Sequence, residues 1–122
     1  MILLNSSIVF PHPASNHDHD VLAVGGDLSI ERLLLAYHYG IFPWFAEGDP
    51  IMWWSPRERY VLPPSEVKVS KSMRNIINRG IYRYTFDTAF VDVIEACSYV
   101  KRQGQPEDSG WLSEDMIDAY LS

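Results

Sequence analysis

Residues 21–40 read VLAVGGDLSIERLLLAYHYG, and this stretch decides the fold of the first part of the chain. A short apolar run ends at Gly25-Gly26, and residues 27–29 then offer an N-cap to apolar residues that recur at helical spacing up to Gly40. The pattern predicts a helix over residues 30–39. The two glycines could present amides to an anion, but the Lys and Ser/Thr of a phosphate loop are missing, so a tight turn before a capped helix is favoured.

The segments outside this helix predict further helices and strands. Two prolines in residues 11–20 indicate a loop, and residues 51–54 are strand-like before Ser55-Pro56. The later patterns predict a strand over residues 59–62, a helix capped by Ser70 with Met73, Ile76 and Ile77 facing inward, a strand over 81–86, a helix over 87–99 and a helix after Ser113. We therefore expect an α+β fold.

Length and composition limit the classes of protein that this chain can form. With 122 residues, 47% of them apolar and 21% charged, it suits one core and neither disorder nor a repeat array. The lone Cys97 cannot form an internal disulfide, and it falls on the apolar face of a helix with Phe90, Val93 and Ile94, which predicts a buried, inert thiol. No signal peptide is visible and no apolar stretch approaches about 18 residues, so we expect a cytoplasmic protein and no membrane span.

Charge is distributed unevenly along the chain. The formal net charge is −6, yet residues 67–86 carry five bases and no acid, namely Lys68, Lys71, Arg74, Arg79 and Arg83. Residues 103–122 carry acids and no base. The basic segment is either an ordinary solvated helix face or a surface for a polyanion, and the nearby aromatic residues favour nucleic acid.

An aromatic loop over residues 42–56 holds three of the four tryptophans. Indoles on a loop fixed by proline and glycine can stack a base, which favours such a role for Trp44. Trp53 and Trp54 are adjacent in a presumed strand, so one is expected to face inward and the other outward, and core packing is favoured for the pair.

Metal and nucleophile chemistry find little support in the residues. The cluster His12, His17, Asp18, His19 and Asp20 has metal-capable groups, but no Cys or distant His completes a ligand shell, so we expect no metal site. No Ser-His-Asp or Cys-His arrangement is legible. The residues alone therefore predict a soluble α+β piece with an aromatic loop, a basic segment and no catalytic group.

Four segments in order, VLAVGGDLS (21–29), RLLLAY (32–37), GIFPWF (40–45) and GDPIMWWSP (48–56), closely resemble the leucyl/phenylalanyl-tRNA–protein transferase family. The resemblance continues through VSKSMR (69–74), TFD (85–87), AFVDVI (89–94) and GWLS (110–113) with Met116, Ala119 and Tyr120. It implies a bacterial cytoplasmic aminoacyltransferase that moves Leu or Phe, also Met, from aminoacyl-tRNA to proteins with N-terminal Arg or Lys and so marks them for degradation. It implies no cofactor, because the ester of the charged tRNA is already activated.

The same resemblance implies a domain division and a set of binding residues. Residues 1–58 would form a small N-terminal α/β domain, and residues 59–122 would begin an acetyltransferase-like α/β domain. Trp44 and Trp111 match tryptophans that hold the terminal adenosine of the aminoacyl-tRNA, and Tyr37 and Tyr120 match tyrosines that line the same site. The basic segment would meet the acceptor stem, with phosphate contacts from Lys68, Lys71 and Arg74.

Family members continue beyond the helix that contains Tyr120, so we expect a truncated chain with no catalytic residue among the 122 and no activity by itself. An unburied stripe on Met116, Ile117 and Tyr120, together with an unpaired sheet edge, predicts self-association. The alternative is a non-catalytic RNA-binding or peptide-binding module that retains the aromatic loop.

Overall fold

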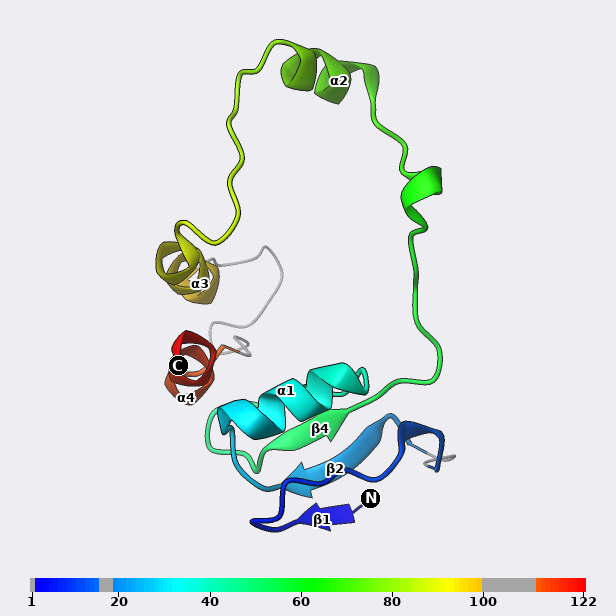
Figure 1. The fold of residues 1–122 in the computed structure, drawn as a ribbon, viewed down its shortest axis with the longest axis vertical. Coiled ribbons are helices and arrows are strands. Elements are labelled where there is room, and N and C mark those ends of the chain that lie inside the picture. Colours follow the sequence, from blue (N-terminus) through cyan, green and yellow to red (C-terminus); the bar gives the residue numbers. More distant parts are fainter. Residues whose placement is uncertain (1, 16–18, 100–111) are drawn as a thin grey trace. The chain divides into compact units, whose positions relative to one another are not determined.

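The structure is a computed structural model that describes residues 2–15, 19–99 and 112–122 (Figure 1). Within these ranges it has four strands and four α-helices, which confirms the expected α+β fold. The chain divides into a first unit, Met1–Arg57 with Val91–Ser122, and a second unit, Glu58–Phe90. The elements are β1 (Ile2–Leu4), β2 (Val21–Gly25), α1 (Ile30–His38), β3 (Phe42–Pro43), β4 (Met52–Trp54), α2 (Lys71–Asn78), α3 (Phe90–Tyr99) and α4 (Glu114–Leu121), with 3-10 turns at Pro13–Ser15 and Pro64–Glu66.

The four strands form one mixed sheet in the order β1-β2-β4-β3. β1 runs parallel to β2, whereas β4 is antiparallel to both β2 and β3. Helix α1 lies along this sheet (Figure 1) and buries Leu33 and Ala36 in a core shared with Trp53. The three-residue β1 and two-residue β3 were not expected from the sequence, because such short strands show no measurable alternation.

Trp53 is the largest side chain of the core. It is fully buried, its indole Nε1 donates to the carbonyl oxygen of Gly25 at 2.9 Å, and its ring meets the Phe10 ring edge-on at 4.8 Å. Trp54, the next residue, is only partly buried. The expected alternation of the two adjacent tryptophans is therefore confirmed.

Helix α1 begins as expected, but its N-terminus is held differently. Ser29 occupies the N-cap position without a side-chain cap hydrogen bond. Instead, Oδ1 of Asp27 accepts from the amide of Ser29 at 3.0 Å and from Nε of Arg32 at 3.2 Å. The turn is thus fixed by an aspartate two residues before the N-cap.

Arg32 is a buried cation that joins three parts of the first unit. Its side chain is 0% exposed, and Nη2 bonds both Oδ2 of Asp27 at 3.1 Å and the carbonyl of Asn5 at 2.9 Å. Nη1 donates to the carbonyl of Ser7 at 3.2 Å. A buried charge requires such partners, and here the chain after β1, the β2–α1 turn and helix α1 supply them together.

Gly26 is required at this turn for two reasons. Its φ is +79°, a conformation that side-chain-bearing residues rarely adopt, and a Cβ there would lie 3.1 Å from the guanidinium carbon of Arg32. The Gly25-Gly26-Asp27 segment therefore connects β2 to α1, and the space beside Gly26 is taken by Arg32.

Helix α2 of the second unit confirms one expectation and corrects another. Oγ of Ser70 accepts from the amide of Met73 at 3.2 Å, as expected of an N-cap. Met73 and Ile77 are exposed, however, so the face that was expected to point inward is not buried.

The two strands expected in the second unit, over residues 59–62 and 81–86, are absent from the part of the chain that the structure describes. Side chains in both segments are exposed, among them Tyr60, Val61, Tyr82 and Tyr84. A strand requires a hydrogen-bonding neighbour, and β-rich composition alone supplies none.

Two expectations about the last helices are wrong. Helix α3 buries Ile94 but leaves Phe90, Val93 and Cys97 exposed, because only a narrow strip of the helix is covered. Helix α4 is capped by Ser113, whose Oγ accepts from the amide of Met116 at 3.3 Å, as expected. Met116 is fully buried and Ala119 packs against the sheet core, so the predicted stripe is covered in part by the first unit itself.

A helix that spans a membrane must be both long and apolar. No helix within residues 2–15, 19–99 and 112–122 is both long enough and apolar enough to cross a bilayer.

The Asp27–Arg32 pair predicts a pH-dependent stability. Hydrogen bonds from Arg32 are the main cause that holds the pKa of Asp27 well below its ordinary value. The resulting stabilisation is present above the ordinary carboxyl pKa of about 4 and is lost as pH falls towards the lower, folded-state pKa. Because Asp27 is 49% exposed, we expect Asp27→Asn to cost only about 1 kcal/mol at neutral pH, less in acid.

The measurement is urea unfolding of wild type and Asp27→Asn from neutral pH down to about pH 2, with Asp49→Asn, an exposed carboxylate in a turn, as the matched control. The two unfolding free energies should converge in acid for Asp27→Asn. A constant difference across the pH range would contradict the assignment.

Candidate functional site

Trp44 lies directly after β3 and is held by its backbone at both ends. Its amide donates to the carbonyl of Met52 at 2.9 Å, and its own carbonyl accepts from Nε1 of Trp54 at 2.7 Å. Trp44 nevertheless remains 52% exposed. A large flat ring on a fixed backbone can stack a base with little loss of conformational entropy.

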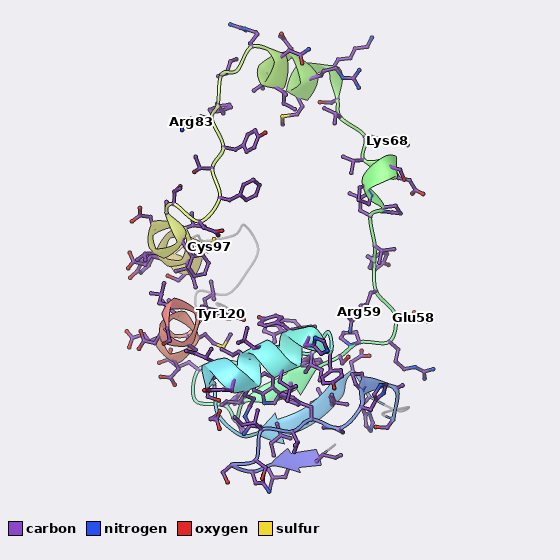
Figure 2. All side chains as sticks on the ribbon, in the orientation of Figure 1. Glu58, Arg59, Lys68, Arg83, Cys97 and Tyr120 are labelled. Carbon is purple, nitrogen blue, oxygen red and sulfur yellow. The ribbon has the colours of Figure 1, made fainter. Side chains whose placement is uncertain are left out.

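The structure brings together Tyr37 of α1 and Tyr120 of α4, which are 83 residues apart in sequence. Their hydroxyl groups form a hydrogen bond in which either can donate, and the ring centroids lie 6.4 Å apart. Figure 2 shows Tyr120 on α4, in the first unit. Burial raises the pKa of Tyr120 well above its ordinary value, and the hydrogen bond to Tyr37 adds to this effect.

The other candidate site residues are Trp111 and three basic residues. Trp111 lies outside the described residues. Lys68, Lys71 and Arg74 are exposed and belong to the second unit, which is described by itself. Figure 2 labels Lys68. Lys71 and Arg74 are three residues apart on α2, so they share one helix face.

The candidate metal ligands do not form a cluster in the described part of the chain. Within residues 2–15, 19–99 and 112–122, no three His, Cys, Asp or Glu side chains are placed to hold a metal ion. His17 and Asp18 of the sequence cluster lie outside these residues. His12 instead accepts a hydrogen bond from the amide of Ala14 through Nδ1 at 3.1 Å, which is a local turn contact.

Trp54 is the residue of this region whose contacts the sequence did not predict. It was expected only to pack, yet its indole donates to Trp44 and the two ring centroids lie 5.5 Å apart. The available signal was that a partly buried indole N–H usually has an acceptor. Which acceptor it takes depends on how β3 and β4 pair, and this is not visible in the sequence.

Comparison with known families defines the class of protein first. The model for the leucyl/phenylalanyl-tRNA protein transferase N-terminal domain matches residues 26–57, which contain α1 and the aromatic loop. The model for leucyl/phenylalanyl-tRNA protein transferase itself matches residues 61–122. The chain belongs to the leucyl/phenylalanyl-tRNA protein transferase family.

Individual relatives agree with this assignment. The chain is 51% identical over 120 residues to the leucyl/phenylalanyl-tRNA–protein transferase of Flavobacterium psychrophilum, covering 98% of this chain and 56% of the relative. Identity to the protein of the same name from Flavobacterium johnsoniae is 48%, with the same two coverages, and to that from Syntrophobacter fumaroxidans 48%, covering 96% of this chain and 49% of the relative. The chain thus spans about half the length of the curated relatives it matches.

The tyrosine pair predicts a measurable change in one pKa. Since burial is the larger cause of the raised pKa of Tyr120, Tyr37→Phe should lower that pKa only in part, and it should remain above the ordinary value of about 10. The measurement is a pH titration of the Tyr120 Cζ chemical shift in carbon-13-labelled protein, assigned by comparison with Tyr120→Phe. Tyr99→Phe, a change at an exposed ring on α3, is the control. If the pKa of Tyr120 falls to its ordinary value in Tyr37→Phe, the hydrogen bond to Tyr37, and not burial, is the larger cause of the shift.

Proposed function

We propose that this protein takes part in moving Leu or Phe, and also Met, from aminoacyl-tRNA to the N-terminal Arg or Lys of acceptor proteins, which marks those proteins for degradation. Membership of the transferase family and the names of its bacterial relatives support this function. The observation that carries the proposal is the half-exposed Trp44, held by hydrogen bonds on both sides of its Cα. Its partners are aminoacyl-tRNA and the acceptor protein, and its compartment is the cytoplasm.

The reaction requires little beyond positioning. The amino acid is already an activated ester of the terminal ribose, so the acceptor amine must be deprotonated, aligned and offered to the carbonyl carbon. No cofactor is needed for this step. We assign to the described residues the binding of the tRNA end, and we expect the 122 residues alone not to transfer.

Trp44 would stack on the terminal adenine, together with Trp111. Tyr37 and Tyr120 would line the same site, where their shared hydrogen bond gives the two rings a fixed spacing. Such a surface binds through ring faces and reads no base sequence.

The basic segment would contact tRNA phosphates. Lys68, Lys71 and Arg74 are exposed, and Lys71 lies in the first turn of α2, where the helix dipole disfavours a cation. An anion bound beside it would offset that cost. Contacts of this kind orient the acceptor stem without reading its sequence.

Self-association is a further expectation for these 122 residues. The second unit exposes Tyr60, Val61, Tyr82 and Tyr84, and such a collection of apolar side chains favours contact with another surface. This argument replaces the one based on Met116, which is buried.

The stacking role of Trp44 predicts a large effect on the use of charged tRNA. In the product of the complete reading frame, Trp44→Ala should raise the apparent constant for aminoacyl-tRNA tenfold to hundredfold, from the loss of roughly 1 to 3 kcal/mol of stacking. The measurement is transfer of labelled Phe to a substrate with N-terminal Arg, against charged-tRNA concentration. Tyr99→Ala, which removes an exposed ring elsewhere, should change little. Unaltered kinetics in folded Trp44→Ala would favour the alternative, a binding module without this activity.

The phosphate role of α2 predicts a salt-dependent effect. Lys71→Ala should weaken tRNA binding modestly, and the loss should shrink as salt is raised, because a contact with one phosphate contributes roughly 0.7 to 0.9 to the slope of log K against log salt. Binding of deacylated tRNA is measured over a series of KCl concentrations. Trp44→Ala is the control, since lost stacking should leave the slope unchanged. Equal slopes for wild type and Lys71→Ala would contradict a phosphate contact by Lys71 of α2.

A further inference from the structure

Trp54 makes two separate contacts with Trp44. From the end of β4 its Nε1 donates to the backbone carbonyl of Trp44 at 2.7 Å, and its ring lies 5.5 Å from the Trp44 ring, centroid to centroid, at an angle of 50°. One contact fixes the backbone of Trp44 and the other limits the rotation of its side chain. A partner used only to fill space would require neither the donor nor this placement.

The position of β3 in the sheet explains why the hydrogen bond matters. β3 is an edge strand of two residues, and one of them, Pro43, has no amide to donate. The amide of Trp44 extends the pairing by one bond to the carbonyl of Met52, just past the end of β3. The carbonyl of Trp44, in turn, accepts its hydrogen bond from the indole of Trp54 at the end of β4.

The same contacts leave part of the Trp44 ring available. The Trp54 ring contacts the Trp44 ring at a tilted angle, and Trp44 remains 52% exposed. A ring that occupies one orientation before binding loses less freedom when a base stacks on it, so the fraction of molecules ready to bind is larger.

We propose that Trp54 is a positioning residue for the aminoacyl-tRNA site: it holds Trp44 in the orientation that stacks on the terminal adenine and does not touch the nucleotide itself. This inference rests on the proposed function of Trp44. It also separates the two adjacent tryptophans by role, because the indole N–H of Trp53 is used inside the core, on the carbonyl of Gly25.

The first test measures the position of Trp44 without any activity. The protein is labelled with 5-fluorotryptophan, and the Trp44 fluorine resonance is assigned by comparison with Trp44→Phe. Trp54→Phe keeps an aromatic ring and removes the N–H donor, so the Trp44 resonance should shift and broaden. Trp53→Phe removes a donor from the core and should leave the Trp44 resonance in place. An unchanged Trp44 resonance in folded Trp54→Phe would overturn the proposal.

The second test measures transfer by the product of the complete reading frame, at equal folded fraction. Trp54→Phe should raise the KM for charged tRNA about threefold to tenfold with kcat unchanged, since the competent fraction of free protein falls. In a Trp44→Ala background, Trp54→Phe should have no further effect, because the two residues act through one ring.

The outcomes distinguish the two proposals. If Trp44→Ala weakens tRNA use while Trp54→Phe behaves as wild type, stacking by Trp44 stands and positioning by Trp54 is wrong. If Trp44→Ala itself has no effect, the stacking role is wrong and the positioning inference is wrong with it. If Trp54→Phe raises KM equally in both backgrounds, Trp54 acts independently of Trp44, which also overturns the inference.

Discussion

The buried guanidinium of Arg32 is the interaction on which the first unit depends. The Arg32 side chain is fully buried, so its N–H groups need hydrogen-bond acceptors from the protein itself. Asp27, Asn5 and Ser7 provide them. These acceptors belong to the β2–α1 turn and to the chain that follows β1. The hydrogen bonds of this one cation thus hold the start of α1 against the N-terminal segment. Gly26, which has no side chain, leaves room for the guanidinium group.

The placement of the functional aromatics follows from α1 and the sheet. Helix α1 packs on the sheet with Leu33 and Ala36 in the core. Tyr37 of this helix then lies where its hydroxyl group bonds that of Tyr120 on α4. The alternation of β4 then assigns Trp53 to the core and Trp54 to the side where Trp44 emerges. Two neighbouring indoles on one strand serve different carbonyls, one internal and one next to an exposed ring.

The parts of the fold that were predicted from sequence are those governed by local rules. Helix α1 and the N-caps Ser70 and Ser113 depend on residues within one or two turns of each other, and all three are confirmed. The strands expected over residues 59–62 and 81–86 are wrong because pairing depends on a partner that composition does not specify. The contact between Arg32 and Asn5 spans 27 residues, which no short pattern reveals.

The candidate site follows the same division. The accessibility of Trp44 was predicted from the adjacent proline and the loop, and the structure agrees, whereas its adenosine-stacking role stays a prediction. The hydrogen bond from Trp54 depends on strand register, and a shared site for Tyr37 and Tyr120 was expected only from resemblance to a family, without their direct contact. For Cys97 the sequence pattern was misleading. The apolar residues of α3 predicted that the thiol is buried, but only the strip around Ile94 is covered.

The discontinuity of the first unit has a consequence for chain length. Residues 1–57 and 91–122 form one compact unit, so residues 58–90 form a loop that leaves this unit and returns to it. The entropy of closing such a loop grows only with the logarithm of its length, about 0.6 kcal/mol for each doubling. Insertions and deletions in residues 58–90 are therefore inexpensive for the first unit, whereas one residue added between Asp27 and Arg32 would move Arg32 off its partners. We therefore expect the first unit to tolerate variation in length over residues 58–90, but not in the segment between Asp27 and Arg32.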